Sequence, residues 1–293
     1  MDRRTDRRGF LKGLGAATAA ALGAAGLGQA APTAARPAIR PAVPPVPGLR
    51  LGLASYSFRA FKAEEALDMT KRLGLTRLSV KDMHLSPKES LGGIRSFRAK
   101  ARDRGVEVYA CGVVYMKSEA DVAQAFQFAK DANMELIVGV PEYELLPKIE
   151  EWITRTNVKL AIHNHGPEDK LFPSPESIYA RIKTRDPRIG LCMDIGHTMR
   201  CGIDPSVAAE HCFDRLLDIH SKDVTADTAK GTTVEAGRGI IDIPKLFKTL
   251  MALGYTGTVS LEYEKDERDP LPGAAESHGY FRGVLTGLEA KAL

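Results

Sequence analysis

Ionisable side chains directly follow five of the short apolar runs in this sequence. They occur at Lys81-Asp82-Met83-His84, His163-Asn164-His165, Asp194-Ile195-Gly196-His197, His220-Ser221-Lys222-Asp223 and Glu262-Tyr263-Glu264. Five of the seven histidines belong to these segments. Imidazole and carboxylate groups together are typical ligands of Mn, Co, Fe, Mg or Zn. We therefore expect one divalent metal ion, provided that the fold brings the ends of these runs to one place.

The spacing of the apolar runs predicts such a fold. Short segments rich in Val, Ile and Leu alternate eight times with amphipathic segments, as expected for parallel strands that are covered on both faces. The expected strands are residues 51–57, 77–81, 106–114, 136–140, 159–163, 189–194, 216–220 and 258–262. The expected helices are residues 63–73, 87–104, 118–132, 142–155, 175–184, 205–212, 243–253 and 275–288. This pattern favours the α/β class and a closed, single-domain (β/α)8 TIM barrel.

In a barrel of this kind, catalytic residues lie at the C-terminal ends of the strands. A His, an Asp, a second His and a Glu follow the last four expected strands and would converge there. No Gly-x-Gly-x-x-Gly motif follows the first strand, which argues against a dinucleotide fold. None of the four cysteines forms a Cys-x-x-Cys pair, which argues against a thiolate zinc site.

The first 30 residues have the three parts of an export signal. Arg7-Arg8 is followed by Phe10-Leu11-Lys12, which resembles a twin-arginine motif, then by a soft apolar run and small residues. We expect a twin-arginine signal peptide over residues 1–30, a Pro- and Ala-rich linker over 31–48 and the barrel over 49–293. The protein would then be exported to the periplasm. It would have no stable membrane anchor, because no later run approaches the ~20 apolar residues of a membrane span.

The net charge of +4 comes mostly from this leader. Residues 1–30 contain five basic and two acidic side chains, so 36 basic and 35 acidic side chains remain for the rest of the chain. A nearly neutral barrel offers no electrostatic attraction to nucleic acid. We therefore expect a small-molecule partner and no nucleic-acid partner.

Three motifs, in order, resemble segments of the xylose isomerase-like barrel superfamily. Asp194-Ile195-Gly196-His197 resembles its Asp-x-Gly-His segment, and His220-Ser221-Lys222-Asp223 its His-x-Lys-Asp segment. Val259-Ser260-Leu261-Glu262 resembles its last strand with a ligand Glu. The superfamily includes sugar and sugar phosphate isomerases and epimerases, inosose dehydratases and the endonuclease IV fold. Such barrels often form homodimers, although no residue identifies an interface here.

The resemblance implies that Asp194, His220 and Glu262 are metal ligands. The fourth ligand is usually a Glu at the end of the fifth strand, where this chain has His163, with His165 as the competing ligand. Substrate contacts are expected from Lys81, His84, His197 and Arg238.

Family isomerases and epimerases remove a proton next to a carbonyl and return it with two carboxylates. This chain keeps Glu262 but has imidazole in place of the other carboxylate, so His165 and Lys222 join Glu262 as candidate catalytic groups. We expect a sugar isomerase or epimerase acting on a non-phosphorylated sugar, because sugar phosphates are cytoplasmic. The alternatives are a lyase or dehydratase acting on a keto-sugar or 3-keto-glycoside, and a non-catalytic sugar-binding protein. A DNA repair nuclease is disfavoured by the low charge and the export signal.

Overall fold

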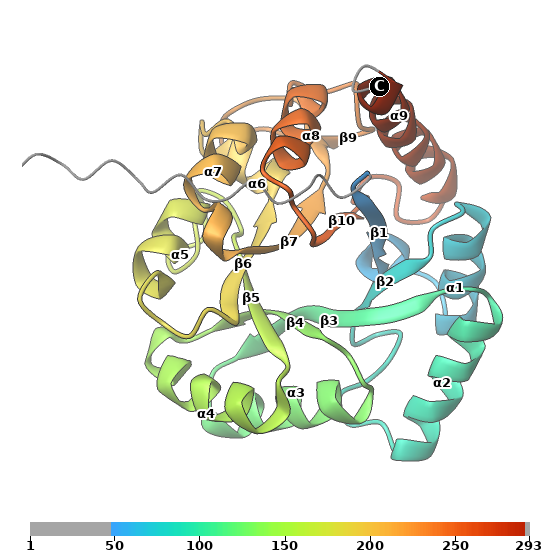
Figure 1. The fold of residues 1–293 in the computed structure, drawn as a ribbon. Helices are drawn as coiled ribbons and strands as arrows, with labels where there is room; N and C mark the ends of the chain where they lie inside the picture. Colours follow the sequence, from blue (N-terminus) through green and yellow to red (C-terminus); the bar gives the residue numbers. More distant parts are fainter. Residues whose placement is uncertain (1–47, 291–293) are drawn as a thin grey trace, which may run out of the picture. The chain divides into compact units, whose positions relative to one another are not determined.

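The computed structural model describes residues 48–290, so the expected signal peptide and nearly all of the linker lie outside the described residues. Eight parallel strands form a closed barrel in the order β1-β10-β7-β6-β5-β4-β3-β2 (Figure 1). These strands are β1 (Arg50–Ala54), β2 (Arg77–Val80), β3 (Glu107–Met116), β4 (Leu136–Pro141), β5 (Lys159–His163), β6 (Ile189–Asp194), β7 (Leu216–Ser221) and β10 (Thr258–Leu261). The prediction of a single-domain (β/α)8 barrel is confirmed.

Helices surround the barrel on its outside (Figure 1). They are α1 (Ala63–Arg72), α2 (Leu91–Asp103), α3 (Glu119–Asp131), α4 (Leu146–Thr156), α5 (Pro175–Ile182), α6 (Ile195–Arg200), α7 (Pro205–His211), α8 (Ile243–Ala252) and α9 (Leu271–Ala290). Three of them begin at a serine cap, since Ser90, Ser118 and Ser174 each accept a hydrogen bond from the backbone N–H three residues later. The first turn of each helix thus gains a partner for an otherwise unpaired donor.

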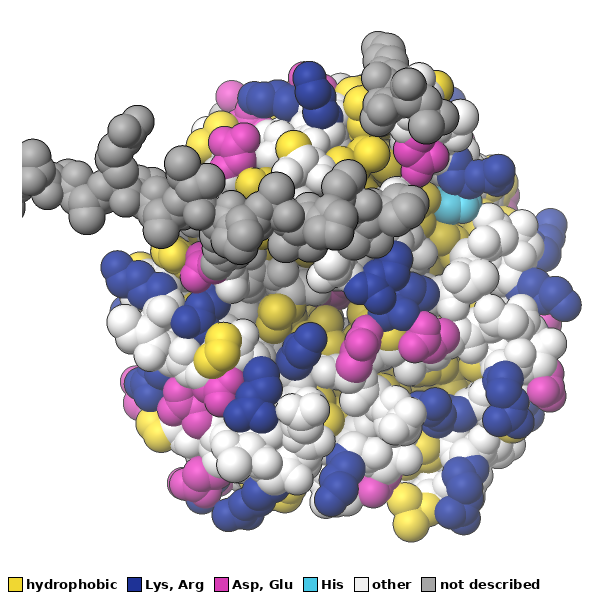
Figure 2. All heavy atoms as spheres, viewed as in Figure 1, with side chains coloured by type: hydrophobic (Ala, Val, Ile, Leu, Met, Phe, Trp, Pro, Cys, Tyr) yellow, Lys and Arg dark blue, Asp and Glu magenta, His cyan; other side chains and the backbone are white. Residues whose placement is uncertain are grey.

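The core lies between the strands and the helices. Phe126 of α3, Phe247 of α8 and Phe281 of α9 are fully buried there. Burying side chains of this size is the main favourable term in folding. None of the helices in residues 48–290 is both long and apolar enough to span a bilayer. On the face shown in Figure 2, basic and acidic side chains are interspersed.

The structure departs from the expected elements after three of the strands. The first strand ends at Ala54, because Ser55–Phe58 forms a short 3-10 helix, η1. Helix α6 begins directly after β6 and was not expected. A small antiparallel pair, β8 (Asp223–Val224) and β9 (Thr233–Val234), also forms after β7. All three features lie at the end of the barrel where the strands finish.

Strand pairing places the candidate ligands on neighbouring strands at the same end of the barrel. Asp194 of β6 pairs with His220 of β7, and Ser260 of β10 pairs with the same residue. Glu262, two residues after Ser260, donates its backbone N–H to the carbonyl of Ser221 at 2.9 Å. Because residues at a shared register point the same way across a parallel sheet, these side chains meet inside the barrel mouth.

Candidate active site

Four buried side chains lie together at the C-terminal end of the barrel: His163, Asp194, His220 and Glu262. Each offers one ligand atom, and these atoms all lie within 4.8 Å of one another. The residues are at most 5 % exposed. The first three belong to β5, β6 and β7 and the fourth directly follows β10, and these strands are neighbours in the barrel. The fold thus gathers the four residues that the sequence indicated as ligands.

The separations between the ligand atoms fit a metal ion. His163 Nε2 lies 3.1 Å from His220 Nδ1 and 3.5 Å from Asp194 Oδ2. His220 Nδ1 lies 3.3 Å from Glu262 Oε2. Bonds of about 2.1 Å place neighbouring ligand atoms about 3.0 Å apart in an octahedron and about 3.4 Å apart in a tetrahedron. The donor set therefore matches one divalent cation of this size.

The protonation of the cluster also suits a cation. Burial lowers the pKa of His163 to about 3, so this imidazole is neutral at ordinary pH. Burial alone would raise the pKa of Asp194, but the Lys222 ammonium and the neighbouring imidazoles outweigh it and hold that pKa well below its usual value. For His220, burial is outweighed by the Glu262 carboxylate and other acids, which raise its pKa. A metal at this site would displace the proton of His220 on binding.

Lys222 supplies a positive charge beside the cluster. Its Nζ lies 2.9 Å from Asp194 Oδ2 and 2.8 Å from Glu262 Oε2, and it also bonds to Glu264. Burial lowers its pKa, but these three carboxylates raise it well above the usual value, so the amine is an ammonium. Three carboxylates and one ammonium leave two negative charges, which one divalent cation balances.

The Asp-x-Gly-His segment has a local structural explanation. The Asp194 side chain accepts the backbone N–H of His197 at 2.8 Å and thereby caps α6. A Cβ atom on Gly196 would lie 2.5 Å from Cγ of Lys222, so only glycine leaves room for the lysine stem. The motif thus turns the chain after β6, orients a ligand and makes space for the ammonium group.

A cavity of about 340 Å³ opens above the cluster. Its lining combines the candidate ligands His163 and Glu262 with further aromatic and ionisable side chains, namely Tyr56, Lys81, Tyr115, His165, His197 and Glu264, together with Val113. We call it the mouth cavity. Its volume lies near the lower end of the range for small-molecule sites, about 300–1,000 Å³. This size suits a single sugar ring.

His165 and His197 line the mouth cavity and have different partners. The His165 ring stacks on Tyr115 with 6.0 Å between centroids, and its Nδ1 lies 3.5 Å from Asp169 Oδ2. Burial and the nearby His197 lower the pKa of His165. His197 Nδ1 lies 3.2 Å from a guanidinium nitrogen of Arg200. Since a guanidinium only donates, Nδ1 of His197 accepts this hydrogen bond.

Two expected substrate contacts lie elsewhere. His84 is 5 % exposed, with Nδ1 2.8 Å from the Ser55 hydroxyl and Nε2 3.2 Å from the carbonyls of Phe58 and Phe61. Both ring nitrogens are thus engaged in holding η1 and the chain that follows. Arg238 is exposed and forms a bidentate pair with Glu276, at 2.5 and 2.7 Å. Neither residue lines the mouth cavity.

Besides Tyr56 and Val113, three residues of the site were not proposed from the sequence. Asn164 is buried, accepts the backbone N–H of Asp194 at 2.9 Å and thereby ties the end of β5 to β6. Glu264 bonds to Lys222 and was signalled by its alternation with Glu262, since residues two apart share a strand face. Tyr115 lies at the end of β3, which extends to Met116, further than the expected strand. The sequence around Tyr115 contains no motif that indicates a site residue.

Comparison with known proteins gives a family match. The model of the xylose isomerase-like TIM barrel family matches residues 67–284 of this chain. The rhizopine catabolism protein MocC of Rhizobium meliloti is 26% identical over 150 residues, which are 45% of this chain and 46% of that protein. Inosose dehydratase of Geobacillus kaustophilus (strain HTA426) is 27% identical over 141 residues, 43% of this chain and 44% of that protein. The matched segments span about half the length of these curated relatives.

The solved structure of 3-keto-D-glucoside 4-epimerase, YcjR, from E. coli has the same fold. It superposes with a TM-score of 0.66 at 16% identity and covers 80% of this chain and 99% of that one. Identity this low shows the shared barrel architecture and no more.

Proposed function

Because the chain belongs to the xylose isomerase-like TIM barrel family, we propose that it is a metal-dependent sugar isomerase or epimerase. It would remove a proton next to the carbonyl of a non-phosphorylated sugar. The observation that carries this proposal is the convergence of His163, Asp194, His220 and Glu262 beneath a cavity lined by further ionisable groups. The partial sequence match to inosose dehydratase supports a sugar-like substrate with a carbonyl group.

The bound cation would polarise a carbonyl and a neighbouring hydroxyl and make the adjacent C–H more acidic. His165 is the proposed proton acceptor, since it lines the mouth cavity. The Asp169 carboxylate, 3.5 Å from Nδ1, favours a proton on that nitrogen, so the lone pair is on Nε2, 3.5 Å from the Tyr115 hydroxyl. Glu262 combines the roles of ligand and proton carrier, and Lys222 donates hydrogen bonds to it and holds its charge in place.

A lyase or dehydratase reaction is the second candidate, and His163 favours it. The two-carboxylate proton shuttle implied by the family resemblance needs a Glu at this position, and a neutral imidazole there cannot replace it as an anionic base. In the second reaction, one base removes the proton next to the carbonyl, the electron pair forms a C=C bond, and the β substituent leaves with a proton from a general acid. The product would be an unsaturated ketone together with water or an alcohol.

We also propose that the protein is exported through the twin-arginine pathway. The support is the sequence of residues 1–30, and it favours a sugar or glycoside without a phosphate. Fusion of residues 1–48 to a reporter should send it to the periplasm. A fusion with Arg7 and Arg8 both changed to Lys should stay inside the cell, and periplasmic reporter from that variant would count against this route.

The metal site is tested by elemental analysis of purified protein. We expect about one divalent ion per chain, and loss of that ion in His220→Ala. His211→Ala is the matched control, because His211 is exposed on α7 away from the cluster and should keep the metal. Equal metal content in the two variants would overturn the site.

The reaction class is tested in deuterated water with ordinary ketoses and 3-keto-glucosides. Deuterium in a sugar whose carbon skeleton and substituents are intact would support the isomerase or epimerase. Release of the aglycone or of water would support the lyase or dehydratase. Tight sugar binding with neither outcome would make the protein a binding protein and would refute the enzymatic proposal.

A further inference from the structure

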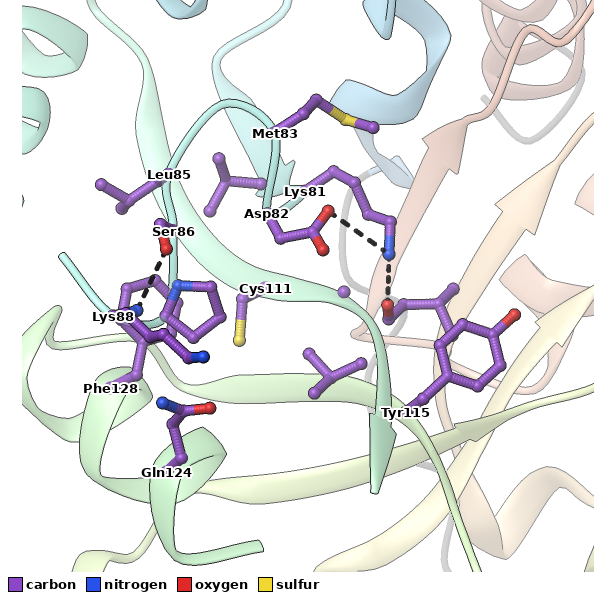
Figure 3. A pocket seen from close by; sticks show the side chains of 15 residues that line it. Lys81, Asp82, Met83, Leu85, Ser86, Lys88, Cys111, Tyr115, Gln124 and Phe128 are labelled. Atoms are coloured by element: carbon purple, nitrogen blue, oxygen red, sulfur yellow. Dashed lines mark hydrogen bonds and ion pairs between the residues drawn. The ribbon is translucent and has the colours of Figure 1, made fainter. Parts of the chain in front are cut away.

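A second cavity of about 560 Å³ lies beside the mouth cavity, between the ends of β2 and β3 and helix α3. Figure 3 shows Lys81 and Tyr115 on one side of it and Lys88, Gln124 and Phe128 on the other. We call it the side cavity. None of the four metal-ligand candidates lines it, so it is not needed to form the metal cluster.

The two cavities share one wall. Lys81, Val113 and Tyr115 line both of them. The pairing of β3 with β4 is irregular between Cys111 and Val114, and the carbonyl of Val113 accepts a hydrogen bond of 2.5 Å from Lys81 Nζ. A strand irregularity of this kind re-aims the chain near its end, and here it places a half-buried carbonyl and an ammonium between the two spaces.

The lining of the side cavity is half apolar. Met83 and Tyr115 are 46% and 58% exposed and lie in one cavity, where Leu85 and Phe128 form the deeper part of the wall. Lys88 and Gln124 place polar groups at the opposite side (Figure 3). Apolar walls with a few polar groups are typical of sites for small organic molecules, and aromatic faces pack well against rings. A ring with one apolar face and one polar edge fits this chemistry.

We propose that the side cavity is an aglycone subsite and that the substrate is a glycoside. The reacting sugar ring lies in the mouth cavity above the ligands, and its ring-bearing substituent passes Tyr115 into the side cavity. A free monosaccharide would fill the mouth cavity, near 340 Å³, and leave Met83 and the rest of the side cavity in water. This inference rests on the proposed function, because it assigns a binding site to the aglycone of a substrate whose sugar ring reacts at the metal site.

The test compares the binding of paired glycosides by calorimetry on the metal-loaded protein. The probes are methyl and 4-nitrophenyl β-D-glycosides of glucose, galactose and xylose, which lack the ketone and cannot react. For at least one sugar, the nitrophenyl glycoside should bind about tenfold more tightly than the methyl glycoside, which corresponds to about 1.4 kcal/mol. Gln124→Trp should remove this preference, because the indole would fill the side cavity, and should leave methyl glycoside affinity unchanged.

Gln127→Trp is the matched control. Gln127 lies on the same helix, is exposed and does not line the cavity, so the nitrophenyl preference should survive. Equal affinity for the two glycosides of every sugar, the absence of binding by any of them, or an unchanged preference in Gln124→Trp would each overturn the inference. Deuterium exchange into a free ketose would still support the proposed function in those cases, so the two failures are distinguishable.

Discussion

Replacing Gly196 by alanine should destabilise the protein, although the same change in an ordinary helix is favourable. The added Cβ would lie 2.5 Å from Cγ and 2.8 Å from Cδ of Lys222, and 3.2 Å from Val224 Cγ1. Ordinary carbon contacts begin near 3.5 Å, so the lysine stem would have to move by about 1 Å. Its Nζ lies only 2.8 and 2.9 Å from Glu262 and Asp194, and it would lose these contacts.

The magnitude follows from two opposing terms. Glycine to alanine in a helix interior gains about 0.5–1 kcal/mol. Forcing an extra methyl group into a packed core costs about 1–3 kcal/mol, and the displaced ammonium adds to that cost. We therefore expect a net loss of about 1–3 kcal/mol for Gly196→Ala. Gly283→Ala is the control, because Gly283 is exposed on α9 with nothing within 4 Å of its added Cβ, and it should be neutral or stabilising.

Equilibrium urea unfolding of the two variants measures the difference. A double variant sharpens the result, because Gly196→Ala should cost much less when Lys222 has already been changed to Ala. If Gly196→Ala were as stable as Gly283→Ala, or if its cost were the same with and without Lys222, the steric reasoning would be refuted. A shift of this size should also lower any turnover by about a hundredfold, because reacting groups tolerate little misplacement.

Two further predictions concern residues around the site. Asp223 is fully buried, and its carboxylate accepts hydrogen bonds from four backbone N–H groups, of Val224 and of loop residues 237, 239 and 241, at 2.9–3.1 Å. Asp223→Ala should therefore lower the free energy of unfolding in urea by about 3 kcal/mol and speed proteolysis of residues 237–241. An unchanged rate of proteolysis in this loop would contradict the prediction. His84→Gln should lower the stability of the protein, whereas Arg238→Ala should leave it unchanged. Sugar affinity measured by calorimetry should change by no more than about twofold in either variant, because neither side chain lines the mouth cavity. A larger loss of affinity would indicate that these residues contact the substrate.

Much of the fold could be predicted because its strands are buried on both faces. The expected and observed boundaries of β5 and β6 are the same, since continuous apolar runs between polar turns leave little freedom. Helix α6 was missed because it is six residues long and its cap, Asp194, is also the last residue of β6. The Asp-x-Gly-His motif was interpreted as a ligand segment, but it is also the start of a helix. Its periodicity does not distinguish these two roles. The β8–β9 pair is too short to produce a strand pattern.

The candidate ligands could be located because a strand end fixes both position and direction. His163, Asp194 and His220 are themselves strand residues, so the barrel determines where they point. His84 and Arg238 lie in loops after a strand, where local hydrogen bonds decide the direction of the side chain. For His84 these bonds are the Ser55 hydroxyl and two backbone carbonyls, and for Arg238 the bond is the Glu276 carboxylate. Such partners are distant in sequence, which explains why the chain order alone could not identify them.

The charge of the site explains how a histidine at position 163 can change the expected chemistry and still be compatible with a divalent cation. With Asp194, Glu262 and Glu264 set against Lys222, the neutral imidazole leaves two negative charges for a divalent ion to balance. A glutamate at this position would add a third charge, and it would also provide the second carboxylate of a symmetric proton shuttle. Compared with the family pattern, the chain therefore has the same number of candidate ligand groups but lacks one anionic base. We expect the missing base to be His165, which lies two residues further along on the cavity wall with a carboxylate behind its Nδ1.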